Sequence, residues 1–101
     1  MAGPIELTAS FTETTAATNE IIAAVAGKKI IVTSLVLVCA SANGINWEDG
    51  TTDISGVMSF AANGGYSLSG SRLLETTAAA ALQMTQTDAS VVSGHLTYHY
   101  E

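Results

Sequence analysis

Apolar and polar residues alternate along much of the chain, which is the pattern of a β-strand with one buried face. Successive side chains of a strand point to opposite faces, so a period of two separates a dry face from a wet one. The segment Ile5–Glu13 follows this period, and Leu82–Thr87 and Val92–Tyr100 repeat it. In the first segment the apolar positions are Ile5, Leu7, Ala9 and Phe11. All three segments are therefore predicted to be strands.

Turn residues cut the rest of the chain into short pieces. Asn43-Gly44, Asp49-Gly50 and Asn63-Gly64-Gly65 are strong turn signals, because Asn, Asp and Gly tolerate a positive φ. The pieces between them are rich in β-branched and aromatic residues, and they predict further strands. These are Glu20–Val25, Lys28–Ala40, Ile45–Glu48, Thr52–Ser55, Val57–Phe60, Tyr66–Leu68 and Arg72–Glu75. Many short strands at this spacing are typical of an all-β sandwich or barrel.

Two local segments are interpreted from a turn signal and from helix propensity. Ile45–Glu48 and Thr52–Ser55 flank the Asp49-Gly50 turn, so we expect them to form a hairpin. The alanines between Thr76 and Gln83 favour a helix by propensity. That segment is too short to stand as an isolated helix, so we expect a loop that leads into the next strand.

The length of the chain allows a single domain. We expect residues 1–18 to form an N-terminal arm or an edge strand, and residues 19–101 to form one β-sandwich domain. An alternating apolar arm of this kind is suited to pairing with the edge of a neighbouring sheet.

Charged residues are scarce. They make up 12% of the chain, with a net charge of −6, whereas an average soluble domain carries about 25%. A free monomer needs a charged surface for solubility, so this scarcity favours a surface partly covered by a partner. The alternative is a monomer coated with Ser, Thr, Asn and Gln. Three basic residues cannot form the basic face that a nucleic-acid binder needs, and the acidic balance disfavours an anionic membrane.

The uncharged stretch Ile30–Trp47 invites a transmembrane interpretation. Its apolar centre, Leu35–Ala40, is short, whereas a spanning helix needs about 20 mostly apolar residues. The first residues of the chain also lack the basic and apolar regions of a signal peptide. We therefore expect a protein that does not span a membrane and is made in a cytoplasm.

The titratable residues form no recognisable catalytic group. His95 and His99 would lie about 13 Å apart along a strand, too far to bind one metal ion within one chain. Three carboxylates surround the Asp49-Gly50 turn, where we expect a solvated acidic tip; a weak cation site is the alternative. They are Glu48, Asp49 and Asp53. Cys39 is the single cysteine, and its apolar surroundings predict a core position. We expect no enzymatic activity, no metal and no cofactor.

Aromatic residues are the remaining candidates for binding. Rings can stack on the apolar faces of sugars, so Trp47 and Tyr66 could form a carbohydrate-binding platform. Such rings more often pack in a core or a subunit interface. A buried Trp47 would rule out the platform in its simplest form.

Four segments resemble, in their order and spacing, small virion proteins of tailed bacteriophages and prophages. They are Ile22–Val38, Trp47–Gly56, Ala61–Gly65 and Ser93–Tyr98. They contain an Ala-Gly-Lys-Lys-Ile-Ile-Val strand opening, a Gly-Thr-Thr-Asp-Ile-Ser-Gly hairpin, an Ala-Ala-Asn-Gly-Gly turn and a Ser-Gly-His-Leu-Thr-Tyr strand. The resemblance covers residues 20–101 and does not extend to the first 18. It implies a jelly-roll-like antiparallel β-sandwich of about eight short strands, as in capsid decoration (cement) proteins, without catalytic residues.

The resemblance also implies a function. We expect a virion structural protein, made in the host cytoplasm, that forms a homotrimer on the outside of a phage head, contacts the major capsid protein and stabilises the shell. The alternative is a carbohydrate-binding or receptor-binding module of a phage tail or head fibre. The candidate partner interface consists of Ile5, Leu7, Phe11, Trp47 and Tyr66.

Overall fold

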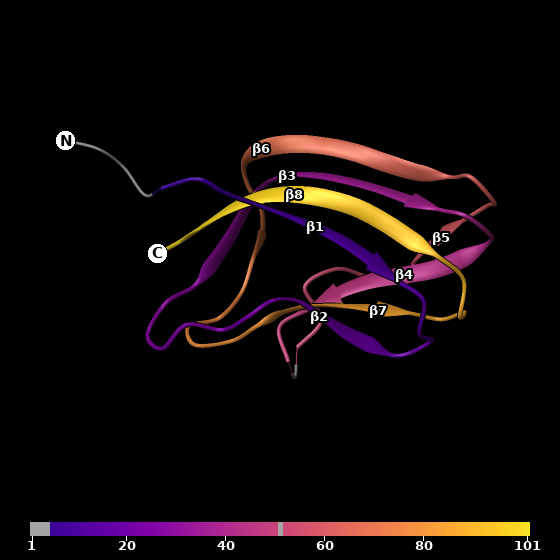
Figure 1. Ribbon diagram of the computed structural model, residues 1–101. Coiled ribbons are helices and arrows are strands. Elements are labelled where there is room, and N and C mark those ends of the chain that lie inside the picture. The colour runs from indigo at the N-terminus through magenta and orange to yellow at the C-terminus, as the bar shows by residue number, and fades with distance from the viewer. Residues whose placement is uncertain (1–4, 51) are drawn as a thin grey trace.

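The computed structural model describes residues 5–50 and 52–101, and it consists of two four-stranded antiparallel sheets packed face to face (Figure 1). The strands are β1 (Leu7–Glu13), β2 (Thr18–Ile22), β3 (Ile30–Cys39), β4 (Asn43–Glu48), β5 (Met58–Phe60), β6 (Gly65–Glu75), β7 (Leu82–Gln86) and β8 (Val92–Tyr100). The described residues contain no helix. The predicted all-β sandwich is confirmed, including the loop between Thr76 and Leu82.

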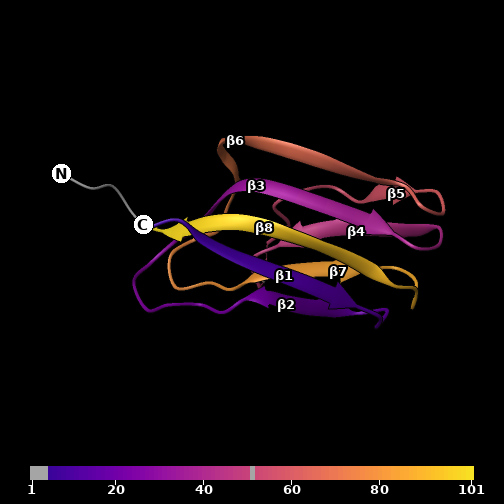
Figure 2. The ribbon, with the colours of Figure 1, turned by 45° about the horizontal axis from the view of Figure 1, so that its top comes forward.

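The order of the strands is that of a jelly roll. Sheet A has the order β1-β8-β3-β6, and sheet B has the order β2-β7-β4-β5 (Figure 2). Each strand of the first half therefore pairs with its counterpart in the second half: β1 with β8, β2 with β7, β3 with β6 and β4 with β5. These nested pairs amount to one long hairpin rolled into a sandwich, which is the jelly-roll arrangement.

Strand β3 lies between β6 and β8 and supplies much of the core of sheet A. Its register with both neighbours shifts between Val32 and Ser34, so Thr33 forms a bulge. A bulge changes which residues of a strand point inward. The buried inner side chains on either side of it are Ile30, Val32, Leu35, Leu37 and Cys39. Burial also raises the pKa of the Cys39 thiol, and the predicted core position of this cysteine is confirmed.

Trp47 of β4 joins the two sheets. Its side chain is fully buried, and its ring meets that of Phe11 edge-on, with centroids 6.0 Å apart and planes at 85°. Its indole N–H donates to the Tyr66 hydroxyl across 3.0 Å. Phe11 belongs to β1 and Tyr66 to β6, so one side chain of sheet B contacts both edge strands of sheet A.

The structure corrects two strand predictions. Residues 52–55 form no strand; a single bridge joins Glu48 to Asp53, and β4 pairs instead with β5. The two pieces predicted between Tyr66 and Glu75 are one strand, β6. Its residues 70–73 bulge against Thr33 of β3, because Ser69 pairs with Ser34 and Leu74 with Val32.

The N-terminal segment contributes β1, an edge strand of sheet A. It pairs with β8 along its whole length, from Leu7 opposite Tyr98 to Glu13 opposite Val92. The side chains that face sheet B become more buried along the strand, from the exposed Leu7 to the buried Phe11.

Gly94 of β8 allows the chain to pass close to β3, and replacing it should destabilise the fold. An alanine Cβ there would lie 2.0 Å from the Val36 carbonyl oxygen and 2.9 Å from Phe11 Cζ. We expect Gly94→Ala to lower the free energy of unfolding by about 1–3 kcal/mol or more, measured by urea denaturation. Gly56→Ala is the matched control, since its Cβ would meet nothing within 4 Å. Equal stability of the two variants would contradict this packing.

Candidate functional site

The outer face of sheet A carries no charged residue over three consecutive rows of side chains. The strand registers align Thr8, Thr97, Ser34 and Ser69 in one row, Ser10, His95, Val36 and Ser67 in the next, and Thr12, Ser93, Val38 and Gly65 in the third. We call these twelve residues the uncharged face. Val38 is 47% exposed, and His95, also exposed, is the single titratable group of the face. His99 also lies on the outer side of sheet A, but at the end of the sheet, where Glu6 and Glu101 cover most of its side chain.

The outer face of sheet B has the opposite character. Glu20, Gln83 and Glu48 lie in one row, beside a row formed by Thr18, Thr85 and Asn46. Asn46 donates to the Asp53 carboxylate across 3.2 Å. The described strands of this sheet carry no Lys or Arg. We call the surface around Glu20, Glu48 and Asp53 the acidic face.

Two of the three basic residues belong to an ion-pair cluster at one end of sheet A. Lys29 and Arg72 both bind Glu75, at 3.2 and 2.9 Å. Arg72 also binds Glu101 at 2.5 Å, and Glu101 binds His99 at 2.7 Å. The second ring nitrogen of His99 lies 3.6 Å from Glu6. The members of the cluster are Glu6, Lys29, Arg72, Glu75, His99 and Glu101.

The ion-pair cluster covers an apolar side chain on the outside of the sheet. Ile31 lies between Glu75 and His99 in the register, outside the main core, yet it is fully buried. Side-chain hydrogen bonds hold the carboxyl pKa values of Glu6, Glu75 and Glu101 low. The Lys29 ammonium is the main cause for Glu75, and His99 is the main cause for Glu101. At Glu6 the main cause is the Thr33 hydroxyl.

The candidate interface residues differ in their exposure. Ile5 is 80% exposed and Leu7 is 37% exposed, so both are accessible to a partner. Phe11 and Trp47 are buried, and this corrects their assignment to the interface: their rings fill the core. Tyr66 is half-buried, and its ring stacks on Phe60 with centroids 5.6 Å apart.

The burial of Trp47 also rules out the simplest carbohydrate platform, because its ring cannot reach a sugar. Burial raises the pKa of the Tyr66 hydroxyl, which accepts from the Trp47 N–H. Trp47 therefore belongs to the core, and Tyr66 packs against that core.

The acidic turn is only in part the solvated tip that the sequence predicts, because Asp53 is exposed and Asp49 is not. Asp49 is buried, and its carboxylate accepts hydrogen bonds from the Thr77 backbone N–H at 2.9 Å and hydroxyl at 3.0 Å. It therefore anchors the loop before β7. Residues 5–50 and 52–101 hold no group of three or more His, Cys, Asp or Glu side chains placed to bind a metal ion. No helix in this part of the chain could cross a membrane.

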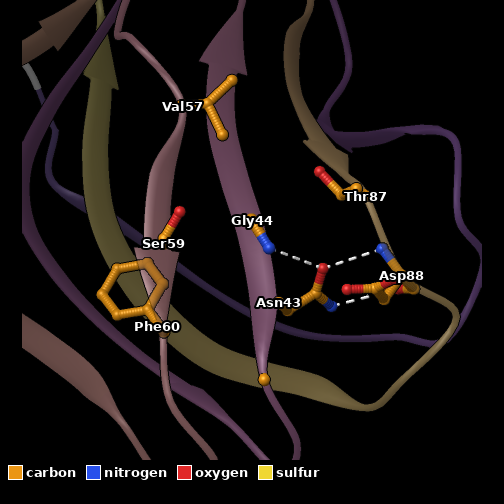
Figure 3. A pocket seen from close by; sticks show the side chains of 8 residues that line it. Asn43, Gly44, Val57, Ser59, Phe60, Thr87 and Asp88 are labelled. Carbon is orange, nitrogen blue, oxygen red and sulfur yellow. Dashed lines mark hydrogen bonds between the residues drawn. The ribbon is translucent and has the colours of Figure 1, made fainter.

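A shallow pocket of about 300 Å³ lies on sheet B (Figure 3). It is at the end of the sheet where β4 begins and where β5 and β7 end. Gly44 forms its floor, between Val57 and Ser59 on one side and Thr87 and Asp88 on the other. The sequence marks Asn43-Gly44 only as a turn. The pocket depends on neighbours distant in the chain, so no local pattern reveals it.

No model of a known protein family matches this sequence, and no curated protein matches it either. The fold, the two contrasting faces and the pocket are therefore what supports a functional proposal.

Loss of the Tyr66 hydroxyl should leave the Trp47 N–H buried without its acceptor. We expect Tyr66→Phe to lower the free energy of unfolding by about 1–3 kcal/mol, measured by urea denaturation. The control is the same change in a Trp47→Phe background, where no indole N–H remains and the cost should largely disappear. An equal cost in both backgrounds would show that the hydrogen bond does not matter.

The ion-pair cluster should make stability depend on acid pH. The carboxyl pKa values of Glu6, Glu75 and Glu101 lie below their ordinary value of 4.5. Their contribution to the stability of the fold is therefore complete above pH 4.5. It is lost as the pH falls through the lowered pKa values. We expect Glu101→Gln to have a lower melting temperature than wild type at neutral pH, with the difference shrinking toward about pH 2 and in about 1 M salt. A difference independent of pH would contradict this.

Proposed function

We propose that the chain is a phage virion structural protein, a decoration protein that forms a trimer on the head exterior and stabilises the shell. The observation that carries this proposal is the uncharged face of sheet A. The jelly-roll fold alone is compatible with it but does not decide it, because capsid proteins, lectins and other proteins share that architecture.

The uncharged face is suited to contact with protein. A solvated sheet surface normally carries charge, and exposed edge strands are normally guarded by Lys, Pro or other devices. Edge strand β6 is uncharged from Gly65 to Ser71, and Leu68 on it is 49% exposed. Apart from His95, the face and this edge together form one continuous surface of mainly small hydroxyl and aliphatic side chains. A partner could cover it without desolvating a carboxylate, an ammonium or a guanidinium group.

The size of the surface indicates more than one contact. Four strands about 4.8 Å apart and three rows about 6.7 Å apart give roughly 400 Å². A stable interface buries about 800 Å² on each partner. The remaining area would come from the β6 edge and from the exposed Ile5 and Leu7 of the N-terminal segment. We assign these surfaces jointly to neighbouring copies and to the major capsid protein.

The acidic face supports a position on the outside of a particle. It lies on the opposite sheet from the uncharged face, so it would point to solvent when sheet A is covered. Carboxylates without basic partners keep such surfaces hydrated and repel one another.

The proposed stabilisation of the shell is mechanical. Added buried area between capsomers resists the pressure of packaged DNA, and no chemical step is required.

A second candidate is a carbohydrate-binding or receptor-binding module of a tail or head fibre. The pocket over Gly44 favours it, because this pocket is a concave site lined by both polar and apolar groups. It lies on sheet B, away from the uncharged face, so the two functions do not compete for one surface.

The test uses the particles of the phage that encodes this chain. Mass spectrometry of purified particles should find the protein in hundreds of copies, in stoichiometric proportion to the capsid. Purified protein should behave in solution as a trimer, with three times the 10.3 kDa of the chain. Absence from particles would end the proposal.

The uncharged face is tested by adding a charge to it. Particles stripped of the protein are offered wild type, Ser67→Lys or Ser59→Lys. Both serines are exposed on strands, Ser67 on sheet A and Ser59 on sheet B. We expect Ser67→Lys to weaken rebinding by at least about tenfold, since an unpaired charge would be buried, and Ser59→Lys to bind as wild type. Equal rebinding by the two variants would exclude sheet A as the contact surface.

A further inference from the structure

The pocket over Gly44 exists because this strand position has no side chain. A Cβ at Gly44 would lie 2.8 Å from Thr87 Oγ1 and 3.2 Å from Val57 Cγ1. Gly44 has an ordinary φ, since the glycines with positive φ are Gly27 and Gly50, so a turn does not require the glycine. Its absent side chain instead leaves the hollow between β5 and the end of β7.

The walls of the pocket are held in place by hydrogen bonds of the buried Asn43 side chain and of the backbone. Asn43 is 4% exposed. Its side-chain oxygen accepts from the Gly44 and Asp88 N–H groups, each at 2.9 Å. Its side-chain nitrogen donates to the Asp88 carbonyl at 3.0 Å (Figure 3). The same nitrogen donates to the Ser90 hydroxyl, also at 3.0 Å. The Thr87 N–H donates to the Gly44 carbonyl at 2.9 Å. A site that is already ordered loses little conformational entropy when a ligand binds.

Three polar side chains on the rim are available to a ligand. The hydroxyls of Ser59 and Thr87 and the carboxylate of Asp88 make no hydrogen bond within the described residues, although the Thr87 and Asp88 backbones do. The hydroxyls can donate or accept, and the carboxylate accepts from two donors. Val57, which is 65% exposed, and Phe60 add apolar surface beside them.

The charge of the lining narrows the ligand class. No Lys, Arg or His lines the pocket, so an anion would meet only the repulsion of Asp88. One carboxylate is also too few to hold a metal ion, and the described residues offer no three-ligand group. A neutral ring with several hydroxyl donors and an apolar face matches the carboxylate, the hydroxyls and the aliphatic wall together. The volume lies at the lower limit for small-molecule sites, which suits a single ring.

We propose that this pocket binds one neutral sugar residue, with adjacent hydroxyls donating to Asp88 and with the ring's C–H face against Val57. An open pocket of this size predicts a dissociation constant on the order of millimolar. The inference supplies the second candidate function with a site and a ligand. The decoration role does not depend on it, because that role uses sheet A.

The experiment is a two-dimensional amide NMR titration of the whole protein with neutral hexoses such as glucose, galactose and mannose. Sialic acid and glucosamine serve as the anionic and cationic comparators. We expect saturable shifts at Gly44, Ser59, Thr87 and Asp88 with at least one neutral sugar. Gly44→Ala should abolish them by filling the floor, and Asp88→Asn should weaken binding about tenfold.

Gly56→Ala is the matched control, because its Cβ would lie in open space, and it should bind as wild type. Gly44→Ala is expected to fold, since the nearest atoms to its Cβ belong to side chains that can rotate; its amide spectrum checks this. Thr87→Ala provides a second test, because it removes one rim hydroxyl and leaves the backbone hydrogen bond to Gly44 in place. It should weaken the binding of the sugar. The proposal is overturned if no neutral sugar shifts these amides, if only a charged sugar does, or if the shifts persist in Gly44→Ala.

Discussion

The fold depends on the burial of Trp47 between the two sheets. Its ring contacts Phe11 on one edge strand of sheet A, and its N–H binds Tyr66 on the other edge strand. Because strand side chains alternate, fixing Trp47 inward also fixes Asn46 and Glu48 outward. The same rule, applied to Phe11, places Ser10 and Thr12 on the outside of sheet A. The chemistry of both outer faces therefore follows from the register that this contact helps to set.

The few charges of the chain are segregated, which gives the two faces their contrast. Lys29 and Arg72 are committed to carboxylates at one end of sheet A. The rest of that sheet's outer face is uncharged, and the carboxylates of sheet B have no basic side chain on their strands. The uncharged face of sheet A therefore has a small desolvation penalty, whereas the acidic face of sheet B is favourably hydrated. This asymmetry supports an oriented protein on a larger surface, and it leaves the pocket of sheet B accessible.

The sequence predicted the strands with clear alternation, because the inward side chains of β1, β7 and β8 are mostly apolar and the outward ones are polar. It failed where the outcome depends on distant partners. The local sequence around an aromatic residue such as Trp47 does not distinguish a core position from a binding platform, because the difference lies in its neighbours in space. Asp49 looked like a solvated turn residue because its partner, Thr77, lies far along the chain. The pocket over Gly44 likewise requires Val57 and Thr87, which the jelly-roll pairing brings together.

The most direct test of the central claim is a cryo-electron microscopy map of the intact particle at a resolution that separates strands. The account predicts jelly-roll density on the head exterior, with the face that contains Val36 and Val38 covered by the capsid protein or a neighbouring copy. Glu20 and Glu48 on sheet B should face solvent. A map in which the outer face of sheet A is open to solvent, while sheet B contacts the shell, would contradict the account.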